Sequence, residues 1–220
     1  MLLGLLGLLA PSGTATAADL DSVLRGMEKV GSELRSLKAR IEQRRWTDLL
    51  QEYDAPEVGE FLFLKNDGKL FLRKEMEQPT KSVLVIADDT VTFYQPGIKQ
   101  AQEYKLGRRK DRAEFLLLGF GTDREAIREA YDVSLAGTEE EDGRTLYHLV
   151  LEPKEERVAA FFRRIELWID GTNYLPVRQK LVEPTEDHLL IVFSEIEANP
   201  RLRPSDFRLK LPKDVEIIRG

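Results

Sequence analysis

The sequence predicts an α+β protein that is mainly β, with a single antiparallel sheet curled into an incomplete, half-open barrel, an N-terminal helix and a helical lid. One amphipathic stretch is followed by many short runs of β-branched and aromatic residues, and turn residues separate these runs. Three of the runs carry apolar side chains on both faces, whereas a strand with one hydrated face alternates. Apolar material must therefore lie on both sides of part of the sheet.

The composition is that of a globular chain with one sizeable core. The 220 residues are 42% hydrophobic and 33% charged, with a formal net charge of -6. Nucleic acids and anionic membrane surfaces favour a basic protein surface, so this acidic balance argues against both as main partners. The chain has no cysteine, which excludes disulfides and cysteine catalysis.

The N-terminus has the pattern of an export signal. Residues 1–10 read MLLGLLGLLA, an apolar run too short to span a bilayer, and small residues follow it. We therefore expect residues 1–18 to be a signal peptide cleaved near Ala17 or Ala18, a periplasmic location, and a single domain formed by residues 19–220. A lipid anchor needs a cysteine, so we expect the exported chain to be unanchored. A buried N-terminal helix is the alternative interpretation.

The next stretch predicts one amphipathic helix of about five turns, because its apolar residues recur at spacings of three and four. Gly26 and Gly31 each weaken this helix by about 1 kcal/mol relative to alanine, so it must depend on what its apolar face covers. The apolar positions are Leu20, Val23, Leu24, Met27, Val30, Leu34 and Leu37.

The chain after this helix predicts mostly strands. Residues 39–43 alternate between uncharged and charged side chains, and residues 59–65 and 70–76 flank Asn66-Asp67-Gly68, a strong hairpin signal because these residues accept positive φ. About ten strands joined by short turns imply one antiparallel sheet that curls. The other predicted strands are residues 81–87, 90–94, 131–136, 145–151, 165–170, 177–182 and 188–196.

A hydrophobic segment interrupts the strands at residues 113–121, AEFLLLGFG. A capping box then begins at Thr122, with Glu125 at the third helical position, and predicts a helix to about Ala130. The segment has two interpretations, a plug that fills the core or a lid over a cavity. The predicted lid residues are Phe115, Leu116, Leu117, Leu118 and Phe120.

The doubly apolar strands predict a cavity. Residues 61–64, 83–86 and 189–193 are apolar on both faces. If the sheet curls, its concave face needs covering, and two short helical segments supply few side chains for this. An apolar cavity large enough for acyl chains follows as a hypothesis. The predicted lining residues are Leu62, Leu70, Leu72, Val83, Val85, Val91, Phe93, Leu167, Ile191 and Phe193.

Several segments carry a family resemblance, in this order: ARIEQ, GEFLFLK, LRKEMEQP, VLVIADDTVTFYQPGIKQ, EFLLLGFG, LWIDGTNYLPVRQ and SDFRLKLPKDVEII. Together they cover essentially the whole chain after residue 18, and they resemble the periplasmic outer-membrane lipoprotein carrier family, the LolA-like proteins. The resemblance implies a non-enzymatic carrier whose cavity takes lipoprotein acyl chains from an inner-membrane donor and passes them to an outer-membrane receptor. We expect such a carrier to be a monomer without a cofactor.

The chain departs from the family pattern at the predicted lid latch. Members commonly have an Arg-Pro pair after the strand that matches GEFLFLK, where this chain has Lys65-Asn66-Asp67. Arg73 matches the arginine of the family's Arg-Trp step and is the candidate lid latch, while Lys74 replaces the tryptophan.

The sequence contains few candidates for catalysis. His148 and His188 are the only histidines and are 40 residues apart, so a metal pair would require the fold to bring them together. No serine lies in a G-x-S-x-G context. We therefore expect no catalytic or metal-binding residues. Two alternatives to a carrier are a lipid-sensing regulatory or binding module of the same fold and an exported domain with a filled core.

Overall fold

The computed structural model describes residues 19–105, 117–120 and 123–219, which form one large sheet with a few helices. The helices are α1 (Leu20–Glu33), α3 (Arg124–Ala130) and α4 (Glu156–Ala159), with single turns η1 (Pro96–Ile98) and η3 (Pro204–Phe207). The strands are β1 (Ser36–Thr47), β2 (Glu52–Tyr53), β3 (Glu57–Asn66), β4 (Lys69–Gln78), β5 (Ser82–Ala87), β6 (Thr90–Gln95), β7 (Gln100–Lys105), β8 (Tyr131–Glu141), β9 (Arg144–Pro153), β10 (Arg164–Asp170), β11 (Pro176–Val182), β12 (His188–Ala198) and β13 (Glu216–Arg219).

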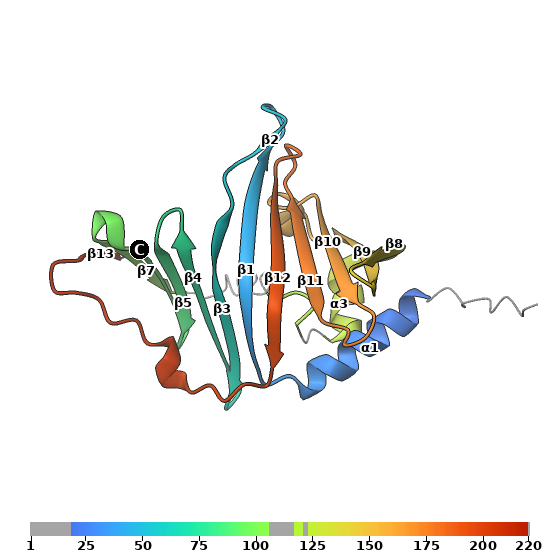
Figure 1. The fold of residues 1–220 in the computed structure, drawn as a ribbon, viewed down its shortest axis with the longest axis horizontal. Helices are drawn as coiled ribbons and strands as arrows, with labels where there is room; N and C mark the ends of the chain where they lie inside the picture. The colour runs from blue at the N-terminus through green and yellow to red at the C-terminus, as the bar shows by residue number, and fades with distance from the viewer. Residues whose placement is uncertain (1–18, 106–116, 121–122, 220) are drawn as a thin grey trace, which may run out of the picture.

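The sheet has 13 strands in the order β13-β7-β6-β5-β4-β3-β1-β12-β11-β10-β9-β8, with β2 paired to β1 beside this path. Neighbouring strands are antiparallel except β7 and β13, which are parallel. The sheet is open, with β8 and β13 at its two ends, and α1 crosses one end of it (Figure 1). The prediction of a single curled, largely antiparallel sheet with an N-terminal helix is confirmed.

The sequence pattern does not predict β2, β7 and β13. These strands bury few side chains: every residue of β2 and β13 is exposed, and in β7 only Ala101 is buried. A strand that buries so little surface does not require a run of apolar residues. Hydrophobic periodicity in the sequence therefore does not predict it.

Helix α1 is shorter than its apolar periodicity predicts. It ends at Glu33, and Leu37 lies in β1, where it pairs with Phe63 and is fully buried. A leucine can be buried equally well in a helix or in a strand. Pairing with β3 places Leu37 in the sheet rather than in the helix. The start of the helix is capped by Asp19, whose carboxylate accepts from the backbone N–H of Ser22 at 2.7 Å.

Helix α3 begins with a different cap from the one predicted. Asp123 is the N-cap, and its carboxylate accepts from the N–H groups of Glu125 and Ala126 at 2.9 and 3.0 Å. Thr122 lies outside the described residues. Asp and Thr are both good N-cap residues, so the local sequence allows either start. The predicted end at Ala130 is confirmed.

The two faces of the sheet have different coverings. We call the face that packs against α1 and residues 117–120 the inner face, and the opposite one the outer face. The inner-face cluster is the main core of the described protein, and α1 contributes Val23, Leu24 and Met27 to it. Because α1 covers only one end of the inner face, other groups must cover the rest.

A second cluster lies on the outer face, where Phe207 of η3 is 1% exposed and packs against strands β3, β4 and β5. The C-terminal segment that carries η3 runs along these strands before β13 joins the edge (Figure 1). In β5, Leu84 and Ile86 therefore contact the inner-face cluster, while Val83 and Val85 contact the second cluster. This explains why β5 is apolar on both faces.

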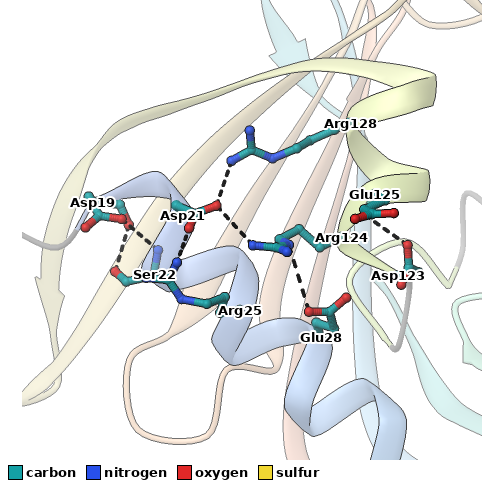
Figure 2. A network of polar contacts seen from close by, with 9 residues as sticks. All are labelled: Asp19, Asp21, Ser22, Arg25, Glu28, Asp123, Arg124, Glu125 and Arg128. Carbon is teal, nitrogen blue, oxygen red and sulfur yellow. Dashed lines mark hydrogen bonds and ion pairs between the residues drawn. The ribbon is translucent and has the colours of Figure 1, made fainter.

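Ion pairs join α1 to α3. The Asp21 carboxylate lies 3.3 Å from Arg124 and 3.0 Å from Arg128, and Arg124 also lies 3.9 Å from Glu28 (Figure 2). These groups are partly exposed, so each pair contributes little stability by itself. The network does fix the position of α3 relative to α1.

Candidate functional site

Residues 117–120 lie against the inner face, and we call these four residues the plug. The side chains of Leu117, Leu118 and Phe120 are 8%, 4% and 2% exposed and belong to the inner-face cluster. The plug forms a tight turn in which the N–H of Phe120 donates to the carbonyl of Leu117 at 2.8 Å. The described part of the predicted lid is thus a turn that points apolar side chains into the sheet.

Phe120 anchors the plug through ring contacts. Its ring centroid lies 5.0 Å from that of Phe193 on β12 and 6.1 Å from that of Phe61 on β3. The rings of Phe61 and Phe193 are 5.7 Å apart, so the three aromatic side chains contact one another. Aromatic pairs of this kind contribute about 0.5–1.5 kcal/mol beyond their buried area.

A buried hydrogen bond also holds the plug. The side-chain Nε2 of Gln179 on β11 donates to the carbonyl of Leu118 at 2.7 Å, and Gln179 is fully buried. Because Nε2 must face this carbonyl, the amide orientation is fixed. Its Oε1 then has no hydrogen-bond partner among the described residues. A buried acceptor without a donor costs about 1–3 kcal/mol, so the inner face carries an unused polar group beside the plug.

Glycine is required at position 119. Its φ is +90°, and a Cβ atom there would lie 3.2 Å from Cγ of Pro176 and 3.5 Å from Cδ1 of Leu167. Any other residue would be strained in this conformation, and its Cβ would crowd the ring of Pro176.

The structure divides the predicted lining residues between the two faces. Phe93 is partly buried and pairs with Leu84 on the inner face. Leu62, Val83 and Val85 instead pack on the outer face with Phe207, contrary to expectation. Successive side chains of a strand alternate between faces, and in these strands both faces are covered, so the pattern alone does not show which residues point inward. The predicted residues in the inner-face cluster are Leu70, Leu72, Val91, Leu167, Ile191 and Phe193.

The predicted lid residues divide in a different way. Leu117, Leu118 and Phe120 form the plug, as given above. Phe115 and Leu116 lie outside the described residues.

The candidate latch Arg73 points away from the plug. It pairs with Leu62 and Val85, which both lie on the outer face, and its Nε donates to the Glu75 carboxylate at 3.1 Å. In the part of the chain that the structure describes, Gln179 rather than Arg73 makes the side-chain hydrogen bond to the plug.

Polar residues that the sequence reasoning missed lie on the inner face near β2. Lys74 shares its face with Leu72 and Met76, and its ammonium donates to Oε1 of Gln43 at 2.9 Å. The Nε2 of Gln43 in turn donates to the carboxylate of Glu57. Burial lowers the pKa of Lys74, and the charge of Glu57 opposes this shift. Lys74 lies two residues from both Leu72 and Met76, and this spacing could have shown that all three residues share one face of β4.

An open pocket begins next to these polar residues, at the end of the inner face far from α1. Its volume is about 460 Å³. Its lining includes both signs of charge and an apolar side chain from β12, so it suits an amphiphilic group. The lining residues are Gln43, Arg45, Asp54, Ala55, Glu57, Pro79 and Leu189.

The two histidines lie in separate clusters. His148 stacks on Trp168 with ring centroids 4.3 Å apart, whereas Nε2 of His188 lies 2.8 Å from the hydroxyl of Tyr53. No group of three or more metal-ligating side chains occurs within the described ranges. Over the same residues, none of the helices combines the length and the apolar character that crossing a bilayer requires.

An open sheet with an apolar inner face, covered by one helix and a short plug, defines a half-barrel of the lipid-binding type. Residues 35–210 match the family model described as "Outer membrane lipoprotein carrier protein LolA". The chain belongs to this family.

One curated relative carries the same description as the family, and two solved structures share the fold. The chain is 27% identical over 159 residues to the outer-membrane lipoprotein carrier protein of Chromohalobacter salexigens, over 72% of this chain and 69% of the relative. Its fold is similar to that of an uncharacterized conserved protein from Thermus thermophilus, with a TM-score of 0.56, 14% identity, and coverage of 91% of this chain and 98% of that one. A crystal structure of MucB matches with a TM-score of 0.54 and 14% identity, over 94% of this chain and 66% of that one.

Proposed function

We propose that this chain is a non-enzymatic periplasmic carrier that holds the acyl chains of lipoproteins on the inner face of its sheet and passes them toward the outer membrane. The observation that carries the proposal is the plug. Three side chains, Leu117, Leu118 and Phe120, cover apolar surface that the sheet and α1 leave uncovered. An acyl chain offers the same kind of surface and can take the place of the plug.

The energetics favour reversible binding. Each buried CH2 group contributes about 0.8 kcal/mol, so an acyl chain has a large gross affinity for an apolar surface. Displacing the plug removes the three-ring contact of Phe120 and the hydrogen bond from Gln179, and these losses offset much of that gain. A carrier needs this balance because it must release its cargo to a receptor.

The family match also supports the proposed location and partners. Family members are carriers for outer-membrane lipoproteins, and the match begins at residue 35. We place an export signal at residues 1–18 and a single domain at residues 19–220. A donor at the inner membrane and a receptor at the outer membrane are the partners that such a monomeric carrier requires.

Binding of a synthetic lipopeptide tests the proposal. The delipidated chain is titrated with a short peptide that carries a diacylated N-terminal cysteine, and separately with the same peptide without acyl groups. We expect saturable binding of the acylated peptide only. Equal binding of the two peptides, or binding of neither, contradicts the proposal.

Two neighbouring substitutions on β6 locate the binding surface. Phe93→Asp places a carboxylate on the inner face opposite Leu84, whereas Thr92→Asp places one on the other face opposite Val85. Both positions are only partly buried, so both variants should fold. We expect a loss of lipopeptide affinity of about tenfold or more for Phe93→Asp, because burying a charge against an acyl chain is costly, and little change for Thr92→Asp.

A further inference from the structure

Lys74 lies beside the surface that the plug covers. In the strand register it pairs with Phe61 on one side and Leu84 on the other, and both of these residues contact the inner-face cluster. Phe61 is also part of the three-ring contact with Phe120. The side chain of Lys74 therefore projects from the inner face of the sheet beside the plug.

The Lys74 ammonium has one hydrogen-bond acceptor among the residues that the structure describes. An ammonium has three N–H donors, and the hydrogen bond found for this one goes to a neutral acceptor, Oε1 of Gln43 at 2.9 Å. Within the described ranges Lys74 forms no ion pair, and the nearby carboxylate of Glu57 accepts a hydrogen bond from Gln43. A partly buried ammonium without an anion in contact among the described residues is unfavourable. Burial lowers the pKa of Lys74, although the charge of Glu57 opposes this shift.

A ligand can approach this ammonium through the open pocket. Gln43 and Glu57 line the pocket of about 460 Å³, and Gln43 is the group that bonds to Lys74. An anionic group that enters the pocket can replace the neutral oxygen of Gln43 at the ammonium. The carboxylates of Asp54 and Glu57 also line the pocket, together with the guanidinium of Arg45. Arg45 already forms an ion pair with Glu183 at 2.9 Å, which leaves Lys74 as the more available cation for an anion in the pocket.

We propose that Lys74 binds the anionic head group of an acyl ligand, a carboxylate or a phosphate, while the hydrocarbon chain lies over Phe61 and Phe193 in place of the plug. This inference rests on the proposed carrier function and adds a ligand class to it. The preferred ligand has its negative charge directly beside its hydrocarbon chain. Charge-assisted hydrogen bonds of this kind are about twice as strong as those between neutral groups.

Three ligands of equal chain length test the inference at neutral pH. Dodecanoic acid and dodecyl phosphate carry a negative charge, and methyl dodecanoate does not. Affinities are measured by isothermal titration of the delipidated full chain. We expect the wild type to bind both anions about tenfold or more tightly than the methyl ester, as the range for hydrogen bonds to charged groups indicates. The tighter of the two anions identifies whether a carboxylate or a phosphate is the better head group.

Variants assign the preference to Lys74. Lys74→Met should remove the preference for the anions, and Lys74→Arg should retain it because the positive charge remains. Lys38→Met is the matched control: Lys38 lies on β1, pairs with Leu62 on the outer face, and forms an ion pair with Glu60 at 2.8 Å. This control should bind all three ligands as the wild type does.

The outcomes separate this inference from the carrier function. If the wild type binds the methyl ester as tightly as the acid, the role of Lys74 is overturned although the carrier function stands. A Lys74→Met variant that keeps the anion preference also overturns it. If no acyl ligand binds to the wild type, the carrier function itself fails. The comparison within the wild type needs no variant to fold.

Discussion

Gln179 on β11 donates its side-chain N–H to the backbone carbonyl of Leu118 at 2.7 Å, across 61 residues of sequence. The bond is fully buried and joins the sheet to the plug. Hydrogen bonds of this kind contribute about 0.5–1.5 kcal/mol net, which is enough to bias the position of a short segment without locking it.

Replacing Gln179 with leucine should loosen the plug. The carbonyl of Leu118 loses its donor, but the Oε1 of Gln179, unsatisfied among the described residues, is removed at the same time. These two effects oppose each other, so we expect the free energy of unfolding to change by less than about 1 kcal/mol. The N–H of Phe120, which donates to Leu117, should exchange with solvent faster than in the wild type. Hydrogen exchange measured by NMR checks both the local and the global change. Gln102→Leu, at an exposed position on β7, should leave the exchange rate unchanged.

Phe120 and Phe207 allow a matched comparison of the two faces. Both are 2% exposed or less, one in the plug and one on the outer face. Replacement of either by alanine should lower the free energy of unfolding by about 3–5 kcal/mol. An acyl ligand on the inner face should restore part of the loss for Phe120→Ala, but not for Phe207→Ala.

Denaturant unfolding with and without a saturating acyl ligand measures this difference. If the ligand stabilises both variants and the wild type by the same amount, the acyl chain does not replace the Phe120 side chain.

Gly26 should resist substitution although it lies in a helix. Alanine favours helices over glycine by about 1 kcal/mol. A Cβ at position 26 would nevertheless lie 2.3 Å from Cδ1 of Tyr174, whose ring packs against α1. We expect Gly26→Ala to lower the free energy of unfolding by about 1–3 kcal/mol, since the ring must move.

A double substitution identifies the cause of this loss. In Tyr174→Ala the space is already open, so adding Gly26→Ala should cost nothing further or stabilise the helix. A loss that persists without the tyrosine ring contradicts the steric explanation.

His188 should make stability depend on pH below 6.5. Burial is the main cause that lowers its pKa from 6.5, and the charge of Lys180 acts in the same direction. The unfolded chain therefore takes up this proton first as the pH falls. The stabilisation is complete above pH 6.5 and is lost as the pH drops through the window below it.

The variant His188→Gln isolates this effect. Glutamine can still bond to the hydroxyl of Tyr53, which lies 2.8 Å from the histidine Nε2, but it does not titrate. The carboxyl of Glu166 has a pKa lowered from 4.5, so its contribution is lost only at more acidic pH. Unfolding followed between pH 6.5 and pH 4.5 should thus show a shallower decline for the variant. Parallel curves for the variant and the wild type would rule out the contribution of His188.

The sequence was informative where one face of an element met water. The alternation in residues 39–43 and the turn at Asn66-Asp67-Gly68 predicted a strand and a hairpin, which the structure contains as β1 and as β3 with β4. In a strand that alternates in this way, the apolar residues mark the buried face and the polar residues mark the exposed face.

The same reasoning failed where both faces are covered. The outward position of Leu62, Val83 and Val85 depends on Phe207, which lies more than 100 residues further along the chain. The local sequence of β3 and β5 gives no information about packing against Phe207. The position of Arg73 on the outer face has the same origin, because the two residues before it, Phe71 and Leu72, are buried on opposite faces of β4.

By itself the sequence determined most of the local conformations, the family and an apolar face larger than the helices cover, because periodicity and turn chemistry act over a few residues. Only the tertiary structure decided which side chains share that face. It brought Gln179 to the plug, and it brought Lys74 beside Phe61 with Gln43 as its partner. Strand register sets these contacts, and register is a property of the whole sheet rather than of any one strand.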